Sequence, residues 1–266
     1  MTAILETEGL TKRYGALAAV DAVACEVEQG EVFGIAGPNG AGKTTLFDVI
    51  SGHARATEGV VRFKGTEIQR LPAYAICHMG MARTYQVASV LTTQTVLGNI
   101  ALASYFGHKK RAVAGFSYDA GAVERAEEAA EFVGLQGALG DPGHLLSAFD
   151  RKRVMFAAAL ATRPDLLLLD EPAGGLSDEE CVHLIDLIRR VKERGVTVMI
   201  VEHVMSVLMT VSDRVMMMHQ GAKFFVGTPR EVQANPDVIK VYLGNVGAEA
   251  GITLEELGSL PEVRDA

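Results

Sequence analysis

The chain has 266 residues, 48% hydrophobic and 22% charged, so it can bury a substantial core and is not expected to be disordered. Its formal net charge of -8 argues against a broad nucleic-acid surface, and no nucleic-acid partner is expected. The longest apolar run, Val154 to Ala161, is far shorter than the roughly 20 residues of a membrane-spanning helix. Three scattered cysteines favour a reducing cytosol, and the N-terminus lacks the pattern of a secretory signal.

The first predicted elements surround a glycine-rich turn. Residues 32–36 are an apolar run that ends at Gly37, which predicts a buried strand. Residues 44–51 then predict a helix stopped by Gly52. Residues 58–65 alternate between apolar and polar side chains, which is typical of a strand.

The rest of the chain continues as helices and strands. Residues 94–160 are predicted to form a helical subdomain inserted into the core, and residues 178–194 a further helix. Three more strands are predicted, at residues 166–169, 196–201 and 214–218. This alternation indicates an α/β fold with a mainly parallel sheet, followed by a loose acidic tail at residues 245–266.

A phosphate-binding loop follows the first of these strands. Residues 37–44, GPNGAGKT, match G-x-x-x-x-G-K-[ST] in full. Its glycines allow backbone N–H groups to close around phosphate oxygens, Lys43 can reach the β and γ phosphates, and the Thr44 hydroxyl can bind Mg²⁺. The alternative is a glycine-rich turn with a chance lysine. Its place between a buried strand and a helix argues against that alternative.

A second motif consists of two carboxylates at the end of the strand at 166–169. Ligands lie at the carboxyl ends of strands in open parallel sheets. Asp170 is therefore expected to hold Mg²⁺ through water, and Glu171 to orient and deprotonate the attacking water. Taken alone, the pair is better explained as a strand capped by solvated acids, and it is the phosphate loop that favours the metal and water roles.

His203 follows the strand at 196–201 by two residues. An imidazole at that strand end is placed to bond a γ-phosphate and respond to its loss, although a single histidine is more often structural. Cys181 and His183 lie in a helix-like stretch without further ligands, so no zinc site is predicted.

Five ordered stretches resemble an ABC transporter ATPase subunit, and in particular the branched-chain amino-acid transport ATPases. They are GPNGAGKTTLFDVISG, RTYQVASVLTTQTVLGNI, ATRPDLLLLDEPAGGL, VEHVM and GTPREVQANPDVIKVYLG. The resemblance covers about residues 4–244, taken as the nucleotide-binding domain. It implies a P-loop NTPase fold with an N-terminal antiparallel β subdomain and an inserted helical subdomain at about 94–160. ATP and Mg²⁺ are the implied cofactors.

The resemblance also implies residue roles. Glu171 matches the catalytic base, His203 the switch histidine, and Gln86 the glutamine that contacts Mg²⁺ and water and moves with the membrane subunit. Ser147 matches the serine that binds the γ-phosphate of the opposite subunit's ATP. Tyr14 matches the aromatic that stacks on adenine, with a core tyrosine as the alternative. The implied nucleotide contacts are Tyr14, Gly37, Pro38, Asn39, Gly40, Ala41, Gly42, Lys43, Thr44, Thr45 and Ser147, and the metal ligands are Thr44, Gln86 and Asp170.

One motif departs from the family. The consensus at residues 146–150, here termed the signature motif, is LSGGQ, whereas this chain has Leu-Ser-Ala-Phe-Asp. The Phe149 ring is expected to obstruct the close approach of backbone to phosphate, or to force the loop aside. Asp150 adds a repulsion of up to a few kcal/mol, roughly, at partial burial. The adjacent basic residues, Arg151, Lys152 and Arg153, are expected to offset that repulsion.

These observations predict an ATP-hydrolysing subunit of an ABC transporter, importing amino acids or similar small polar solutes. The altered signature motif suggests a heterodimer with a paralogous ATPase. Integral membrane permease subunits are the other implied partners, with a solute-binding protein acting indirectly, at the cytoplasmic face of the membrane. One alternative is a non-transport ABC ATPase, which a single phosphate loop in 266 residues argues against. The other is a nucleotide-sensing regulatory scaffold, which the altered motif favours and an intact Glu171 and His203 oppose.

Overall fold

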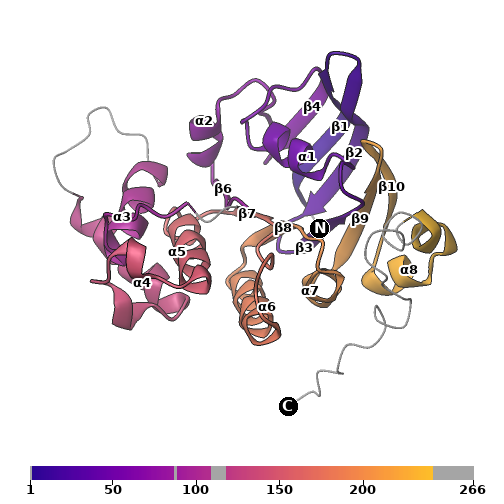
Figure 1. Ribbon diagram of the computed structural model, residues 1–266. Helices are drawn as coiled ribbons and strands as arrows, with labels where there is room; N and C mark the ends of the chain where they lie inside the picture. Colours follow the sequence, from indigo (N-terminus) through magenta and orange to yellow (C-terminus); the bar gives the residue numbers. More distant parts are fainter. Residues whose placement is uncertain (1, 87–88, 109–117, 242–266) are drawn as a thin grey trace.

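The protein is described by a computed structural model, which covers residues 2–86, 89–108 and 118–241 (Figure 1). The predicted tail at 245–266 lies outside the described residues. Within them, the chain forms two sheets, several helices around the larger sheet, and a separate helical group.

The smaller sheet is antiparallel and has the strand order β2-β1-β4-β5. Its strands are β1 (Ala3–Tyr14), β2 (Leu17–Glu28), β4 (Glu58–Phe63) and β5 (Thr66–Glu67). The strand predicted at 58–65 ends earlier, at Phe63, because Lys64 and Gly65 turn the chain with positive φ angles of 50° and 73°. The expected N-terminal antiparallel β subdomain is present.

The larger sheet has the strand order β10-β9-β3-β8-β7-β6, and only its β10–β9 pairing is antiparallel. Its strands are β3 (Val32–Ala36), β6 (Met81–Arg83), β7 (Leu166–Asp170), β8 (Thr197–Val201), β9 (Arg214–His219) and β10 (Ala222–Gly227). Every residue of β3, β7 and β8 is buried, as expected for parallel strands covered on both faces. The mainly parallel α/β core predicted from the sequence is confirmed.

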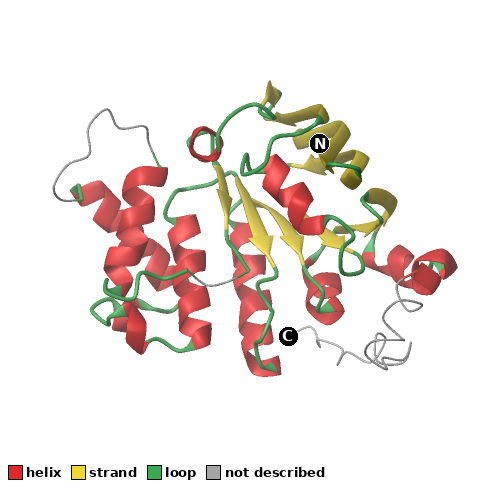
Figure 2. Cartoon of the chain, turned by 45° about the horizontal axis from the view of Figure 1, so that its top comes forward, coloured by secondary structure: helices red, strands yellow, loops and turns green. Residues whose placement is uncertain are grey.

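Helices lie on both sides of this sheet (Figure 2). Those associated with it are α1 (Lys43–Ile50), α2 (Ala73–Cys77), α6 (Asp178–Glu193), α7 (Met205–Val211) and α8 (Pro229–Ala234). The helix predicted at 178–194 corresponds to α6, whose start is fixed by a reciprocal capping box between Ser177 and Glu180. The helix predicted at 44–51 corresponds to α1.

A separate helical group lies beyond β6, as Figure 1 shows. It comprises α3 (Val96–Gly107), α4 (Ala120–Phe132), α5 (Ala148–Leu160) and the short 3₁₀ turns η1 (Gln136–Ala138) and η2 (Gly143–Leu145). Helix α3 contacts both α4 and α5. The predicted inserted helical subdomain is therefore present.

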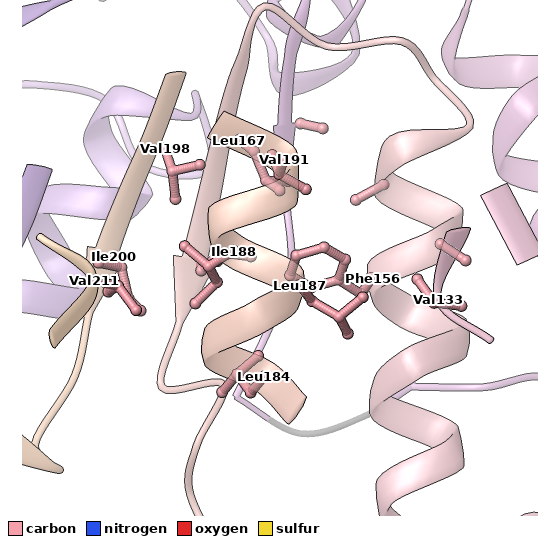
Figure 3. Packing of buried hydrophobic residues seen from close by; sticks show 14 of the residues in the cluster. Val133, Phe156, Leu167, Leu184, Leu187, Ile188, Val191, Val198, Ile200 and Val211 are labelled. Carbon is pink, nitrogen blue, oxygen red and sulfur yellow. The ribbon is translucent and has the colours of Figure 1, made fainter. Parts of the chain in front are cut away.

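The larger sheet separates two hydrophobic cores, because its side chains alternate between faces. Leu167, Val198 and Ile200 point into the core shared with α5, α6 and α7, where Phe156 and Ile188 also lie (Figure 3). Met199 and Leu168 point the other way, into the core formed with α1 and the antiparallel sheet. Both faces of the central strands are thus fixed by packing, and the loops at their carboxyl ends are held in place for the site.

Candidate functional site

The glycine-rich turn leads from β3 into α1 and has a conformation that only glycine fits. At Gly42 the φ angle is 94°, and a Cβ atom would lie 2.0 Å from the carbonyl oxygen of Ala19. At Gly37 a Cβ atom would lie 2.3 Å from the carbonyl oxygen of Met218. The turn therefore packs closely against its surroundings while its other side faces an open cleft.

That cleft has a volume of about 600 Å³. Its lining includes the turn and the first residues of α1, together with Tyr14, Leu17, Glu171 and Gln220. Tyr14 is 52% exposed, so the alternative that it is a core tyrosine is wrong; Lys12 lies over its ring, 4.8 Å from the centroid. The predicted contacts from Asn39 to Thr45 all line this one cleft.

Lys43 is buried at the start of α1. Its Nζ donates to the carbonyl oxygens of Gly37 at 2.7 Å and Pro38 at 3.0 Å, so the ammonium group lies within its own loop. Burial lowers the pKa of Lys43, and the Glu171 and Asp170 carboxylates act against that shift. Thr44, the next residue, is exposed to the cleft.

Asp170, at the end of β7, is buried and held by an arginine that sequence analysis did not single out. Arg83, on β6, donates from Nη2 to Asp170 at 2.7 Å and from Nη1 to Asp48 at 2.7 Å. Burial raises the pKa of Asp170, and Arg83 acts in the opposite direction. The arginine links two strands and α1, which fixes the orientation of the Asp170 carboxylate.

Glu171 lies where Gln86 and His203 meet. Its Oε2 accepts a hydrogen bond from Gln86 Nε2 at 2.5 Å, and His203 Nδ1 is 3.6 Å from the same oxygen. Glu171 has a φ of 47°, a conformation that costs a non-glycine residue roughly 1–3 kcal/mol. Its backbone N–H donates to Val201 at 2.9 Å, which ties the turn to β8. The three predicted catalytic residues are thus adjacent.

Glu202 is a second carboxylate that sequence analysis did not single out. It is fully buried, and its Oε2 accepts the backbone N–H groups of His203 at 3.0 Å and Val204 at 3.1 Å. Its Oε1 accepts the N–H of Ala173 at 2.5 Å. Burial raises the pKa of Glu202, and these backbone hydrogen bonds oppose the shift.

Ser147 lies away from this cleft, at the N-terminus of α5, and its hydroxyl is engaged within the chain. It accepts from the N–H of Asp150 at 3.0 Å and donates to Asp150 Oδ2 at 2.8 Å. Burial acts to raise the pKa of Asp150, but hydrogen bonds from Arg153 and Ser147 outweigh it, so the pKa is lowered.

The three basic residues after Asp150 have different hydrogen-bond partners. Arg153 pairs with Asp150, with its Nε at 3.1 Å from Oδ1. Arg151 instead donates to the carbonyl of His144, and Lys152 donates to Pro172 and Gly174, so of the three only Arg153 hydrogen-bonds Asp150, and the expected offset of its charge stays a prediction. Arginine and lysine side chains are long enough to reach carbonyl groups that are more distant than the neighbouring carboxylate.

Phe149 packs on its own chain. Its ring lies 6.2 Å from the His183 ring, edge to face, and 5.1 Å from the Arg153 guanidinium. The expected obstruction of a phosphate bound by a second subunit stays a prediction.

Among the described residues, no helix is long and apolar enough to span a membrane, and no cluster of acidic, cysteine and histidine side chains is arranged to hold a metal by itself.

Comparison with known proteins agrees with these features. The family described as ABC transporter matches residues 20–174, and the family described as branched-chain amino acid ATP-binding cassette transporter matches residues 223–248. The chain is 38% identical to the high-affinity branched-chain amino acid transport ATP-binding protein BraF of Pseudomonas aeruginosa, over 91% of this chain and 98% of BraF. It is 33% identical to LivG of Escherichia coli, a protein of the same description, with the same coverage of each chain.

A solved structure is similar over nearly the whole chain. The ADP conformation of MJ1267, an ATP-binding cassette of an ABC transporter, aligns with a TM-score of 0.82 at 29% identity. The alignment covers 92% of this chain and 100% of that one.

Proposed function

This chain belongs to the ABC transporter family of ATP-binding subunits, and on that premise we propose that it powers the uptake of amino acids or similar small polar solutes. Members of this family are ATPases that work with membrane permease subunits. The names of BraF and LivG support branched-chain amino acids as the solute class. The observation that carries the proposal is the meeting of Gln86 and His203 at Glu171, beside the cleft that contains Lys43.

The residues in the cleft suit hydrolysis of ATP by water. Lys43 exchanges its two loop carbonyls for β- and γ-phosphate oxygens, which are stronger acceptors because they are charged. Glu171 accepts the proton of the attacking water at Oε2, and Gln86 fixes the position of that oxygen. His203 is close enough to Glu171 to donate to the γ-phosphate in the same arrangement. The exposed ring of Tyr14 provides a face for adenine.

The same region offers ligands that fit Mg²⁺. A threonine hydroxyl, a carboxylate and an amide oxygen, from Thr44, Asp170 and Gln86, are the hard oxygen donors that this ion prefers. Arg83 holds Oδ2 of Asp170, so Oδ1 is the oxygen of this carboxylate that would help to hold the ion. When bound, Mg²⁺ supplies charge neutralisation at the β and γ phosphates.

We infer that the working ATPase is a heterodimer. Ser147 is exposed at the start of α5, outside the cleft of its own chain, so a nucleotide that it contacts must belong to another subunit. Its hydroxyl is engaged by Asp150, and glycine is absent from the motif after it. The intact cleft of this chain is therefore paired with a partner's intact signature motif, and the partner's cleft with the altered one.

A groove beside β6 supports docking of the permease near Gln86. Its volume is about 400 Å³, and it lies between α1, α2 and the helical group, with His53, Tyr74, Tyr85 and Met155 among its lining. Tyr85, next to Gln86, hydrogen-bonds His53 at 2.5 Å and so fixes one wall. Docking there places the chain at the cytoplasmic face of the membrane, and a solute-binding protein acts only through the permease.

The test is to co-purify the native complex and measure its ATPase with each of a series of amino acids and other polar solutes. We expect stimulation by branched-chain amino acids. Lys43→Ala in this chain is expected to weaken ATP binding at its cleft by about 100-fold or more, since it removes two hydrogen bonds to charged acceptors. Lys64→Ala, at an exposed ion pair with Asp165, is the matched control.

Other outcomes overturn parts of the proposal. ATP affinity and turnover unchanged by Lys43→Ala would contradict the nucleotide site. Binding without Glu171-dependent hydrolysis would instead support a nucleotide-sensing scaffold. Cooperative ATPase from the isolated chain, which we expect to be a weak ATPase and a poor homodimer, would contradict the heterodimer.

A further inference from the structure

The turn that carries Glu171 is held from two opposite sides by charged side chains from elsewhere in the fold. Lys152, on α5, donates from Nζ to the carbonyl oxygens of Pro172 at 2.7 Å and Gly174 at 2.6 Å. The N–H of Ala173, between those carbonyls, donates to Glu202 at 2.5 Å. The Pro172 carbonyl and the Ala173 N–H belong to one peptide group, so the ammonium and the carboxylate hold that group from its two ends, and the ammonium also holds the Gly174 carbonyl.

Glu202, which supplies the carboxylate, also accepts a hydrogen bond from the backbone of the switch histidine, His203. Glu202 Oε1 accepts the N–H of Ala173, while its Oε2 accepts the N–H of His203. A single buried side chain thus sets the backbone after Glu171 and the backbone of His203. Because Gln86 and His203 both approach Oε2 of Glu171, a small displacement of either backbone changes the geometry at that oxygen.

Lys152, which supplies the ammonium group, lies on α5, the helix that starts at Ser147. Lys152 is partly buried, which lowers its pKa, and the Glu202 carboxylate favours its charged form. An ammonium has three N–H donors, two of which bond the loop carbonyls. Arginine keeps such donors, and methionine keeps the length of the side chain without any donor.

We propose that Lys152 and Glu202 are positioning residues for hydrolysis, which hold Glu171 in its left-handed turn and His203 beside it. The role rests on the proposed function, because it requires Glu171 to be the base. It assigns to Lys152 a task other than balancing the charge of Asp150. Neither residue needs to touch nucleotide.

The experiment compares Lys152→Met with Lys152→Arg in the co-purified complex. We expect Lys152→Met to lower kcat by about tenfold while KM for ATP changes by less than about twofold, since binding and base positioning are separate. Lys152→Arg should recover most of that loss. The matched control is Lys223→Met, because Lys223 also donates to a backbone carbonyl, that of Ala24 at 2.5 Å, on the far strands β10 and β2.

A merely structural role is separated by repeating Lys152→Met in the Glu171→Gln background. If Lys152 acts through Glu171, residual turnover there should fall by less than about twofold, because effects on one shared function are not additive. An equal fold loss in both backgrounds would overturn the proposal, as would a kcat equal to that of Lys223→Met. Should Lys152→Met fail to fold, Glu202→Gln tests the same segment, with the same split between kcat and KM expected.

The two proposals fail in different ways. A complex whose ATPase does not depend on Lys43 overturns the proposed function. A complex with Lys43-dependent ATPase that Lys152→Met and Glu202→Gln both leave unchanged overturns only the positioning role. Amide hydrogen exchange of residues 171–176 gives a readout without turnover, and exchange unchanged by Lys152→Met would also count against the role.

Discussion

The two segments expected to contact phosphate differ in what their side chains do in this chain. Around Lys43, the loop packs against the sheets and leaves an open cleft of about 600 Å³, and Gln86 and His203 gather at Glu171 on its border. At Ser147, the hydroxyl both donates to and accepts from Asp150 of the same helix. The first segment is arranged around a space for a ligand, whereas the second is satisfied internally. A phosphate at Ser147 has to compete with Asp150.

The largest expected effect lies in the Lys43 region, at Glu171, the proposed catalytic base. Glu171→Gln keeps an oxygen to accept from Gln86 but cannot take a proton, so hydrolysis should fall by about 10²–10⁴-fold with ATP binding retained. The measurement is single-turnover ATPase of the complex together with ATP affinity. Glu179→Gln, at an exposed position on α6, is the control. A fall of less than about tenfold would show that Glu171 is not the principal base.

The ion pair between Arg83 and Asp170 tests whether the stability of the same region depends on a buried pair of charges. Both Arg83 and Asp170 are almost inaccessible, so Arg83→Met leaves an unpaired buried carboxylate and should lower the free energy of unfolding by about 3 kcal/mol. Arg62→Met removes an ion pair of similar length with the exposed Glu8 and should lower the free energy of unfolding far less, because water screens an exposed pair. Urea denaturation measures both. Equal losses would mean that the buried pair does not organise the site.

The pH dependence of the Arg83 effect has a definite sign. Burial raises the pKa of Asp170 in the folded protein. Because this folded pKa lies above the unfolded one, the protein loses stability as pH rises through the range between the two values. Removal of Arg83 raises the folded pKa of Asp170 further. The loss caused by Arg83→Met should therefore be larger at pH 8 than at pH 5. A loss that is independent of pH would show that the Asp170 charge is not its cause.

Much of the Lys43 region could be predicted because its signals are local in the sequence. Apolar runs predicted β3, β7 and β8, and each is followed within two residues by a motif whose chemistry identifies it. Adjacent parallel strands then bring those motifs together at one edge of the sheet.

The residues that were missed have partners far along the chain. Arg83 bonds carboxylates 35 and 87 positions away, and Lys152 bonds carbonyls 20 and 22 positions away. Nothing in the sequence separates such a lysine from a solvated one, because backbone acceptors have no sequence signal. Glu202 had a weak signal, since an acid directly after a buried strand is unusual unless its charge is satisfied.

A smaller effect is expected when the signature motif is restored. In the complex, Phe149→Gly with Asp150→Gln should raise basal ATPase by about tenfold or more, because one hydrogen bond to a charged acceptor contributes roughly 1.5–3 kcal/mol. Asp150→Gln alone should give most of the rise, since Asp150 engages the Ser147 hydroxyl while the Phe149 ring lies against His183. Steady-state ATPase of the two single variants measures how much of the rise comes from Phe149 and how much from Asp150. A rise produced by Phe149→Gly alone would mean that the ring, not the carboxylate, is the obstacle.

The smallest effect on activity is expected for Ser147→Ala. If the site that Ser147 faces hydrolyses ATP poorly, removing its hydroxyl should lower the ATPase of the complex by less than about threefold, far less than Glu171→Gln does. Disrupting the matching serine of the partner ATPase should lower transport much more. The hydroxyl also caps α5 by accepting from the N–H of Asp150, so Ser147→Ala should lower the free energy of unfolding by about 1 kcal/mol. Activity and stability therefore have to be measured on the same samples, by ATPase and urea denaturation. If Ser147→Ala silences the complex as fully as Glu171→Gln, Leu-Ser-Ala-Phe-Asp is a working motif, and the contrast between the two segments does not extend to their function.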